Sequence, residues 1–234
     1  VDILIVNDNS ASMSFEQARL APRFANFIND LDSRNIDYRI AMTTTDVTGS
    51  NGGKLIDFGG TYFLSPKNAT RHEMFNRTIQ RPETLKCEKF IGDWVQTYGR
   101  SGINHPSYAA EYAKNCPSGD ERGIYAANLV VQNNPNNFIR AQAHLAIIFI
   151  PLDQPAGLLN NIKNKYGADK YNSLSVHAIV TRDGSCLTEQ NNQALNGVEA
   201  TRGLVSGSIG SLYMAITEQG WGKSADICST NYPN

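Results

Sequence analysis

The stretch that decides the fold stands at the start of the chain: Asp2-Ile3-Leu4-Ile5-Val6-Asn7-Asp8-Asn9-Ser10-Ala11-Ser12-Met13. Its first half is a continuous apolar run, which is typical of a strand buried on both faces of a parallel sheet. Its second half places a carboxylate and two hydroxyls at alternate positions: Asp8, Ser10 and Ser12. Oxygen ligands of this kind suit Mg²⁺ and similar hard cations. The stretch therefore predicts a buried strand that opens into a cation-binding loop.

Strand and helix patterns alternate along the rest of the chain, as they do in parallel α/β sheets. Further strands are predicted at residues 38–44, 143–150 and 174–180, and residues 55–64 are predicted to form an edge hairpin or a third strand. Helices are predicted from Leu20 to Leu31, over residues 71–79, 90–98, 124–131 and 209–218, and through Leu158, Ile162 and Tyr166. The pattern predicts an α/β fold with a doubly wound, mostly parallel sheet flanked by helices.

Length and composition agree with a single domain over residues 1–234. A chain of 234 residues with 41% hydrophobic residues can bury one substantial core. Residues 66–117 are predicted to form an irregular insertion, because long stretches between core elements are more often functional or stapled than plain connections. The chain begins at Val1, so we expect a processed or excised piece of a longer protein.

Charge and hydrophobicity argue against nucleic acid and membrane as partners. The formal net charge is -1 and the Lys and Arg residues are scattered, so no nucleic-acid partner is expected. The longest apolar run, residues 145–150, is far too short to cross a bilayer. We therefore expect no membrane insertion by this chain.

Four widely spaced cysteines, Cys87, Cys116, Cys186 and Cys228, predict two disulfides. Of the three possible pairings we favour Cys87 with Cys116 and Cys186 with Cys228, since each tethers a segment poor in other structural signals. The alternative is four buried thiols in a cytosolic protein. Disulfides would favour an extracytoplasmic location, whether secreted, periplasmic or on the cell surface.

Several segments resemble bacterial von Willebrand factor A domains. The motif Asp8-x-Ser10-x-Ser12-Met13 is similar to the start of their metal-ion-dependent adhesion site. Residues 38–41 resemble the strand that follows, and residues 146–150 and 175–180 resemble the fourth and fifth strands of that fold. These matches touch most of the core but not residues 66–117.

The resemblance implies a metal site above the carboxyl ends of the strands, completed by two further loops. In the family these loops supply a Thr and an Asp. The second loop here, residues 118–123, carries Glu121 or Asp120 where the Thr is expected. The third loop carries Leu152 near the position of the acid, with Asp153 one step away. The implied metal ligands are Asp8, Ser10, Ser12, Glu121 and Asp153.

Two acidic residues are candidates for a supporting role around the ion. Asp46, after the second strand, is predicted to hold a metal-bound water or to orient a serine, and Asp120 is a candidate for the same task. The alternative for Asp46 is a turn-forming residue at a strand end. For Asp8, Ser10 and Ser12 it is an ordinary loop whose Ser12 or Ser14 caps the next helix.

The resemblance implies a non-enzymatic function: cation-dependent adhesion or protein recognition. A bound Mg²⁺, Mn²⁺ or Ca²⁺ with an open coordination position would take an Asp or Glu carboxylate from a partner protein. One alternative is a scaffold that binds through residues 66–117, where Tyr98, Tyr108 and Tyr112 would form a contact surface. A metal-dependent phosphoesterase is a third reading.

Overall fold

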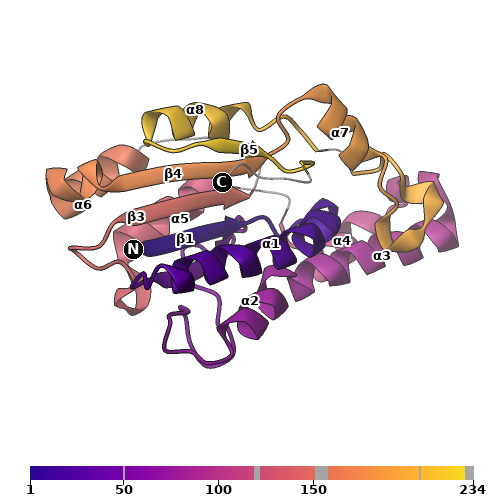
Figure 1. Cartoon of the computed structure of the whole chain (residues 1–234). Helices are drawn as coiled ribbons and strands as arrows, with labels where there is room; N and C mark the ends of the chain where they lie inside the picture. Colours follow the sequence, from indigo (N-terminus) through magenta and orange to yellow (C-terminus); the bar gives the residue numbers. More distant parts are fainter. Residues whose placement is uncertain (50, 119–121, 151–157, 206, 230–234) are drawn as a thin grey trace.

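A five-stranded, all-parallel sheet forms the centre of the protein (Figure 1), which confirms the predicted fold class. The computed structural model describes residues 1–49, 51–118, 122–150, 158–205 and 207–229. The strand order is β2-β1-β3-β4-β5. The strands are β1 (Asp2–Asn7), β2 (Arg39–Thr44), β3 (Leu145–Ile150), β4 (Leu174–Val180) and β5 (Ser224–Asp226).

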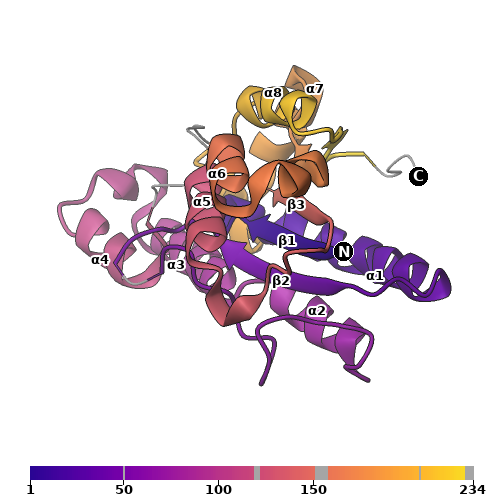
Figure 2. The same cartoon turned by 90° about the vertical axis from the view of Figure 1, so that its left-hand side faces the viewer.

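Helices cover both faces of this sheet (Figures 1 and 2), because successive strand side chains point to opposite faces. From β1, Ile3 and Ile5 enter one apolar cluster, which includes side chains of three helices. Those helices are α1 (Ser14–Ser33), α2 (Arg71–Ile79) and α7 (Gly184–Asn191). Leu4 and Val6 enter the other cluster, on the opposite face. Its helices are α5 (Gly123–Asn133), α6 (Leu158–Asn172) and α8 (Ser211–Gln219).

Residues 66–117 contain more helix than the sequence indicated. Besides α2 they form α3 (Pro82–Tyr98) and α4 (Tyr108–Asn115). Helix α3 begins earlier than predicted, at a proline whose fixed φ suits the first turn of a helix. A small third core joins this segment to the rest of the protein, with Cys87, Ile91 and Val95 packed together with Ala11 from the loop after β1.

Two strand predictions need correction. Residues 55–64 form no strand; a single antiparallel bridge joins Leu64 to Ile40. Gly59 and Gly60 have positive φ, and the Asp57 carboxylate caps a turn that interrupts extended backbone. Strand β5 was not predicted, since its three half-buried residues are too few to show a period.

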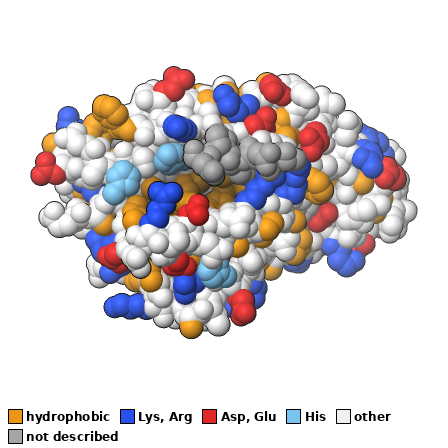
Figure 3. Space-filling view, viewed as in Figure 1, with side chains coloured by type: hydrophobic (Ala, Val, Ile, Leu, Met, Phe, Trp, Pro, Cys, Tyr) orange, Lys and Arg blue, Asp and Glu red, His pale blue; other side chains and the backbone are white. Residues whose placement is uncertain are grey.

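Both predicted disulfides are present, Cys87 with Cys116 and Cys186 with Cys228. Bonds of this kind are typical of oxidising compartments. Among the described residues, no helix is both long and apolar enough to span a membrane. On the face shown in Figure 3, basic and acidic side chains are interspersed, as their scatter in the sequence suggested.

Candidate functional site

The carboxyl ends of three neighbouring strands converge at one edge of the sheet. The backbone N–H of Asp8 donates to the Ile150 carbonyl of β3 at 3.3 Å, and that of Thr45 donates to the Asn7 carbonyl of β1 at 3.3 Å. The carboxyl ends of β1, β2 and β3 therefore lie side by side. Open α/β sheets bind their ligands at such edges.

The loop after β1 brings together the three residues singled out in the sequence. Asp8 is 1% exposed, and its Oδ1 accepts a hydrogen bond from the Ser10 backbone N–H at 2.8 Å. The hydroxyl oxygens of Ser10 and Ser12 lie 3.1 Å apart. Two adjacent ligands of an octahedral Mg²⁺, each about 2.1 Å from the ion, are separated by about 3.0 Å. The hydroxyl pair thus has nearly the spacing that one ion needs, which is also that of a hydrogen bond.

Buried side chains of α1 and α3 hydrogen-bond to the backbone of this loop. The Gln17 side-chain amide donates to the Asp8 carbonyl at 2.7 Å and accepts the Arg81 backbone N–H at 2.9 Å. The Thr84 hydroxyl donates to the Asn9 carbonyl at 2.8 Å. Because Gln17 and Thr84 are fully buried, the loop has a fixed backbone without any ligand.

The second loop is joined to β2 on both of its described sides. The Arg122 backbone N–H donates to the Thr45 carbonyl at 3.0 Å, and the Ser118 side chain is hydrogen-bonded to the Asp46 carboxylate. Between them, Asp120 and Glu121 lie outside the described residues, as do Leu152 and Asp153 of the third loop. Their predicted roles stay predictions.

Asp46 closes its own turn. Its Oδ1 accepts the Thr48 backbone N–H at 2.9 Å and the Thr48 hydroxyl at 2.6 Å, the arrangement of a turn-forming aspartate. Burial alone would raise the pKa of Asp46, but the hydrogen bonds from Thr48, Asn51 and Ser118 outweigh it and lower the pKa. These contacts favour the turn interpretation, while the Ser118 contact also links Asp46 to the second loop.

Thr45 is a residue that the sequence analysis did not single out. Its side chain is 1% exposed, and its hydroxyl has no hydrogen-bond partner among the described residues. The register pairs Asn7 with Thr44, so Asp8 and Thr45 are the first residues after two neighbouring strands. Buried hydroxyls without a partner are rare and destabilising. The sequence signal was weak, because Thr45 ends the uniform run Thr43-Thr44-Thr45.

A buried carboxylate lies in the first turn of α1, beyond the loop. Glu16 is 2% exposed, and its Oε1 accepts hydrogen bonds from Gln190 at 3.1 Å and Gln193 at 3.4 Å. Burial raises the pKa of Glu16 above its ordinary value, with these hydrogen bonds opposing the shift. The contact joins α1 to α7 and the residues that follow it.

A second group of potential metal ligands is less suited to an ion. Cys186, Asp226 and Cys228 bring their ligand atoms within 4.8 Å of one another. However, the two sulfurs are bonded to each other, and only a thiolate is a strong metal ligand. Among the described residues, the loop after β1 is therefore a better candidate for a metal site than the group of Cys186, Asp226 and Cys228.

No protein-family model matches the sequence, and no curated protein matches it. The likeness to von Willebrand factor A domains accordingly stays a prediction from the motif and the strands.

Proposed function

We propose that this protein binds a divalent cation of the Mg²⁺ class at the loop after β1 and uses it for cation-dependent adhesion or protein recognition. The observation that carries the proposal is the pair of hydroxyl oxygens of Ser10 and Ser12, 3.1 Å apart and two residues from the buried Asp8. These residues fit a hard cation, since they offer only oxygen atoms on a backbone that is already fixed.

Ser10 and Ser12 would bind the ion directly, with Asp8 as the nearby carboxylate. Glu121 and Asp153, on the two further loops, are the proposed remaining ligands, and Asp46 and Asp120 would support them. Thr45 joins this group because its hydroxyl has no other described partner. When bound, the cation supplies an electron-poor centre that accepts a carboxylate oxygen from an Asp or Glu of a partner protein.

Calorimetric titration with Mg²⁺, Mn²⁺ and Ca²⁺ tests the ion site. We expect Asp8→Asn and Ser10→Ala to weaken binding of the preferred cation at least tenfold. Asn keeps the oxygen that accepts the Ser10 N–H, so the circular dichroism spectrum should not change. Ser101→Ala, at an exposed position in the turn between α3 and α4, is the control and should bind normally. Absence of measurable binding of all three ions to the unaltered protein would contradict the proposal.

The two alternatives predict other results. A scaffold that binds through residues 66–117 would keep its partner after chelation of metal. In that segment Tyr108 stacks on Phe90 and Tyr112 meets the same ring edge-on, while Tyr98 contacts Trp94 and stays 49% exposed, so all three rings take part in local packing. A phosphoesterase would release p-nitrophenol from p-nitrophenyl phosphate in the presence of Mg²⁺, and we expect no release.

The location follows from the disulfides. Because both pairs of cysteines form disulfides, we propose that the protein acts in an extracytoplasmic, oxidising setting. Its partner would then be another secreted or surface protein.

A further inference from the structure

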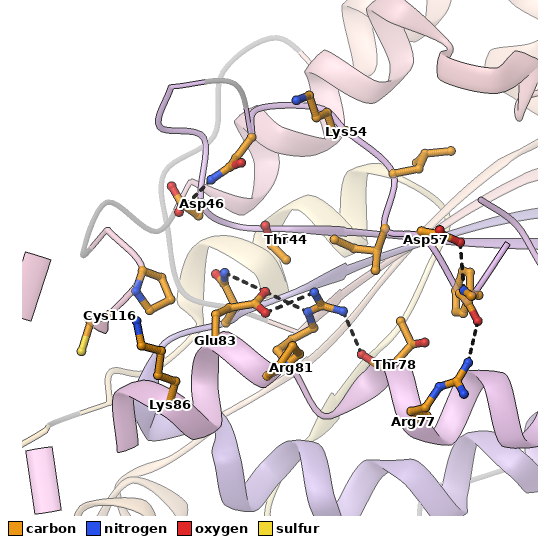
Figure 4. A pocket seen from close by; sticks show the side chains of 18 of the residues that line it. Thr44, Asp46, Lys54, Asp57, Arg77, Thr78, Arg81, Glu83, Lys86 and Cys116 are labelled. Carbon is orange, nitrogen blue, oxygen red and sulfur yellow. Dashed lines mark hydrogen bonds and ion pairs between the residues drawn. The ribbon is translucent and has the colours of Figure 1, made fainter. Parts of the chain in front are cut away.

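A groove with a volume of about 930 Å³ lies beside the loop after β1, at the upper end of the range for ligand pockets. Figure 4 shows one wall formed by the end of β2 and the segment after it, and the other by α2 and α3. The disulfide partner Cys116, after α4, also lines it. Asn9, between Asp8 and Ser10, and Asp46 both belong to the lining. Asp8, Ser10 and Ser12 do not line the groove, so it runs beside the proposed ion position, and Asn9 is the residue of this loop that lines it.

The acidic side chains of the groove are already bound by neighbouring groups. Asp57 accepts backbone N–H bonds from Gly60, Gly59 and Thr61 at 2.7, 2.9 and 3.0 Å, and these bonds lower its pKa. Glu83 pairs with Arg81 at 2.9 Å. Asp46 is likewise held by Thr48 and Ser118, so each of these carboxylates already accepts hydrogen bonds from neighbouring groups.

Three cationic side chains of the groove have no acidic partner among the described residues: Lys54, Arg77 and Lys86. Arg77 donates to the Phe58 carbonyl at 3.1 Å and Lys86 to the Lys114 carbonyl at 2.9 Å. Carbonyl oxygens satisfy a donor without cancelling its charge. In Figure 4, Lys86 lies toward the Asp46 end of the groove and Arg77 toward the other end. The positive charge is therefore distributed along the groove.

The same groove has apolar surface between its charges. Tyr62, which is 44% exposed, and the half-buried Ile56 supply this surface, while Leu55 and Phe58, which also line the groove, are buried. A ligand that fits must therefore combine acidic groups with apolar ones, and an extended peptide does so by alternating its side chains. A purely polar anionic sugar chain would leave the apolar surface uncovered.

We propose that this groove binds an extended acidic segment of a partner protein, with one carboxylate of that segment reaching the cation. The second half of this inference rests on the proposed function, whereas the groove and its charges do not. The cation would then fix one residue of the partner, and Lys54, Arg77 and Lys86 would select for acidic residues along the chain that flanks it.

The test uses two fluorescein-labelled decapeptides, one of five Glu-Ala repeats and one of five Gln-Ala repeats, and measures their fluorescence anisotropy with the full chain in Mg²⁺. We expect the Glu peptide to bind at least tenfold more tightly than its neutral counterpart. Lys54→Glu and Lys86→Glu should each weaken its binding about fivefold or more. Lys67→Glu, at an exposed position outside the groove, is the matched control and should change the affinity less than twofold.

Chelation separates the two proposals. If EDTA abolishes binding and the groove variants have no effect, the ion site stands and the groove is overturned. If the groove variants weaken binding and EDTA does not, the groove is supported and the proposed function fails. An equal loss with Lys67→Glu, or tighter binding of an oligogalacturonate than of the Glu peptide, would overturn the acidic peptide as ligand.

Discussion

The two ends of the parallel sheet are built by different interactions. At the amino end, the fully buried Asp2 is bound by Arg140 through its guanidinium at 2.8 Å and its backbone N–H at 2.6 Å. At the carboxyl end, the buried Asp8 accepts a neutral backbone N–H, and two serine hydroxyls face each other. The carboxylate at the amino end is thus held by an arginine, whereas the serine hydroxyls at the carboxyl end have the spacing that a cation needs.

The two ends of the sheet also differ in the interactions that hold their neighbouring segments in place. The amino end uses charge pairs, since Arg140 also contacts Asp37. Around the carboxyl end the segments are cross-linked covalently: one disulfide ties α3 to the end of α4, and the other ties α7 to the residue that follows β5 by two positions. We therefore expect the two disulfides to supply much of the stability at the carboxyl end of the sheet, where charge pairs supply it at the amino end.

The largest expected effect is the loss of a disulfide. Replacing Cys87 and Cys116 by Ser together, or Cys186 and Cys228 together, should lower the free energy of unfolding by about 3 to 4 kcal/mol in each case. The reason is that loops of 29 and 42 residues are no longer closed in the unfolded chain. Urea unfolding of the oxidised protein measures this loss. A change in the free energy of unfolding below about 1 kcal/mol would show that the carboxyl end of the sheet does not depend on the disulfides for its stability.

Breaking the charge pair at the amino end should cost nearly as much. Arg140→Met leaves the Asp2 carboxylate buried without its guanidinium, and we expect a loss of about 3 kcal/mol. The control is Arg34→Met, at an exposed position beyond α1, which should cost less than about 0.5 kcal/mol. If Asp8→Asn in metal-free buffer cost as much as Arg140→Met, the contrast between the two ends would be wrong.

Thr45→Val tests the carboxyl end of the sheet by separating stability from cation binding. The change removes a buried hydroxyl without a described partner and keeps the side-chain volume, so the metal-free protein should gain up to about 1 kcal/mol in stability. Cation affinity, measured by calorimetry, should fall at the same time, and Thr45→Ser should restore it. A stabilised protein with unchanged affinity would make Thr45 a plain core residue.

The smallest effect concerns Glu16 and depends on pH. A carboxyl whose pKa is raised on folding binds more protons in the folded state, so stability is highest below its unfolded value of 4.5 and falls as pH rises through the folded value. Glu16→Gln removes this slope, and its stability relative to the unaltered protein should rise between pH 4 and pH 7. The exposed Glu73→Gln is the control. Parallel stability curves for Glu16→Gln and the unaltered protein would contradict the burial effect.

The strands with apolar periods were predictable, and so was the pairing of the disulfides. The limits of β1, β3 and β4 lie close to their predicted limits, because β1 and β3 are apolar runs and β4 alternates buried with half-buried residues. The turn at Asp57 follows from local hydrogen bonds of Gly59 and Gly60, which the analysis of apolar patterns did not weigh, whereas the short β5 depends on its pairing with β4. Helix α3 was placed too late, since its first turns carry charged residues outside the apolar stripe.

The candidate site was predictable only where one loop holds all of its atoms. Asp8, Ser10 and Ser12 lie within one stretch of five residues, so the sequence alone placed them in one loop. Thr45 and Gln17 join the same region through strand register and helix packing, which no local motif encodes. Residues far apart in the chain become neighbours at a strand edge only once the strand order is known.

The amide of Gln17 has one further consequence. A single buried side chain connects the Asp8 carbonyl to the first turn of α3, so the conformational entropy of the loop is lost during folding and not when a ligand arrives. An ion entering such a rigid receptor would meet little rearrangement. Association should then be fast, and variants of Gln17 should slow the capture of the ion before they alter how long it stays.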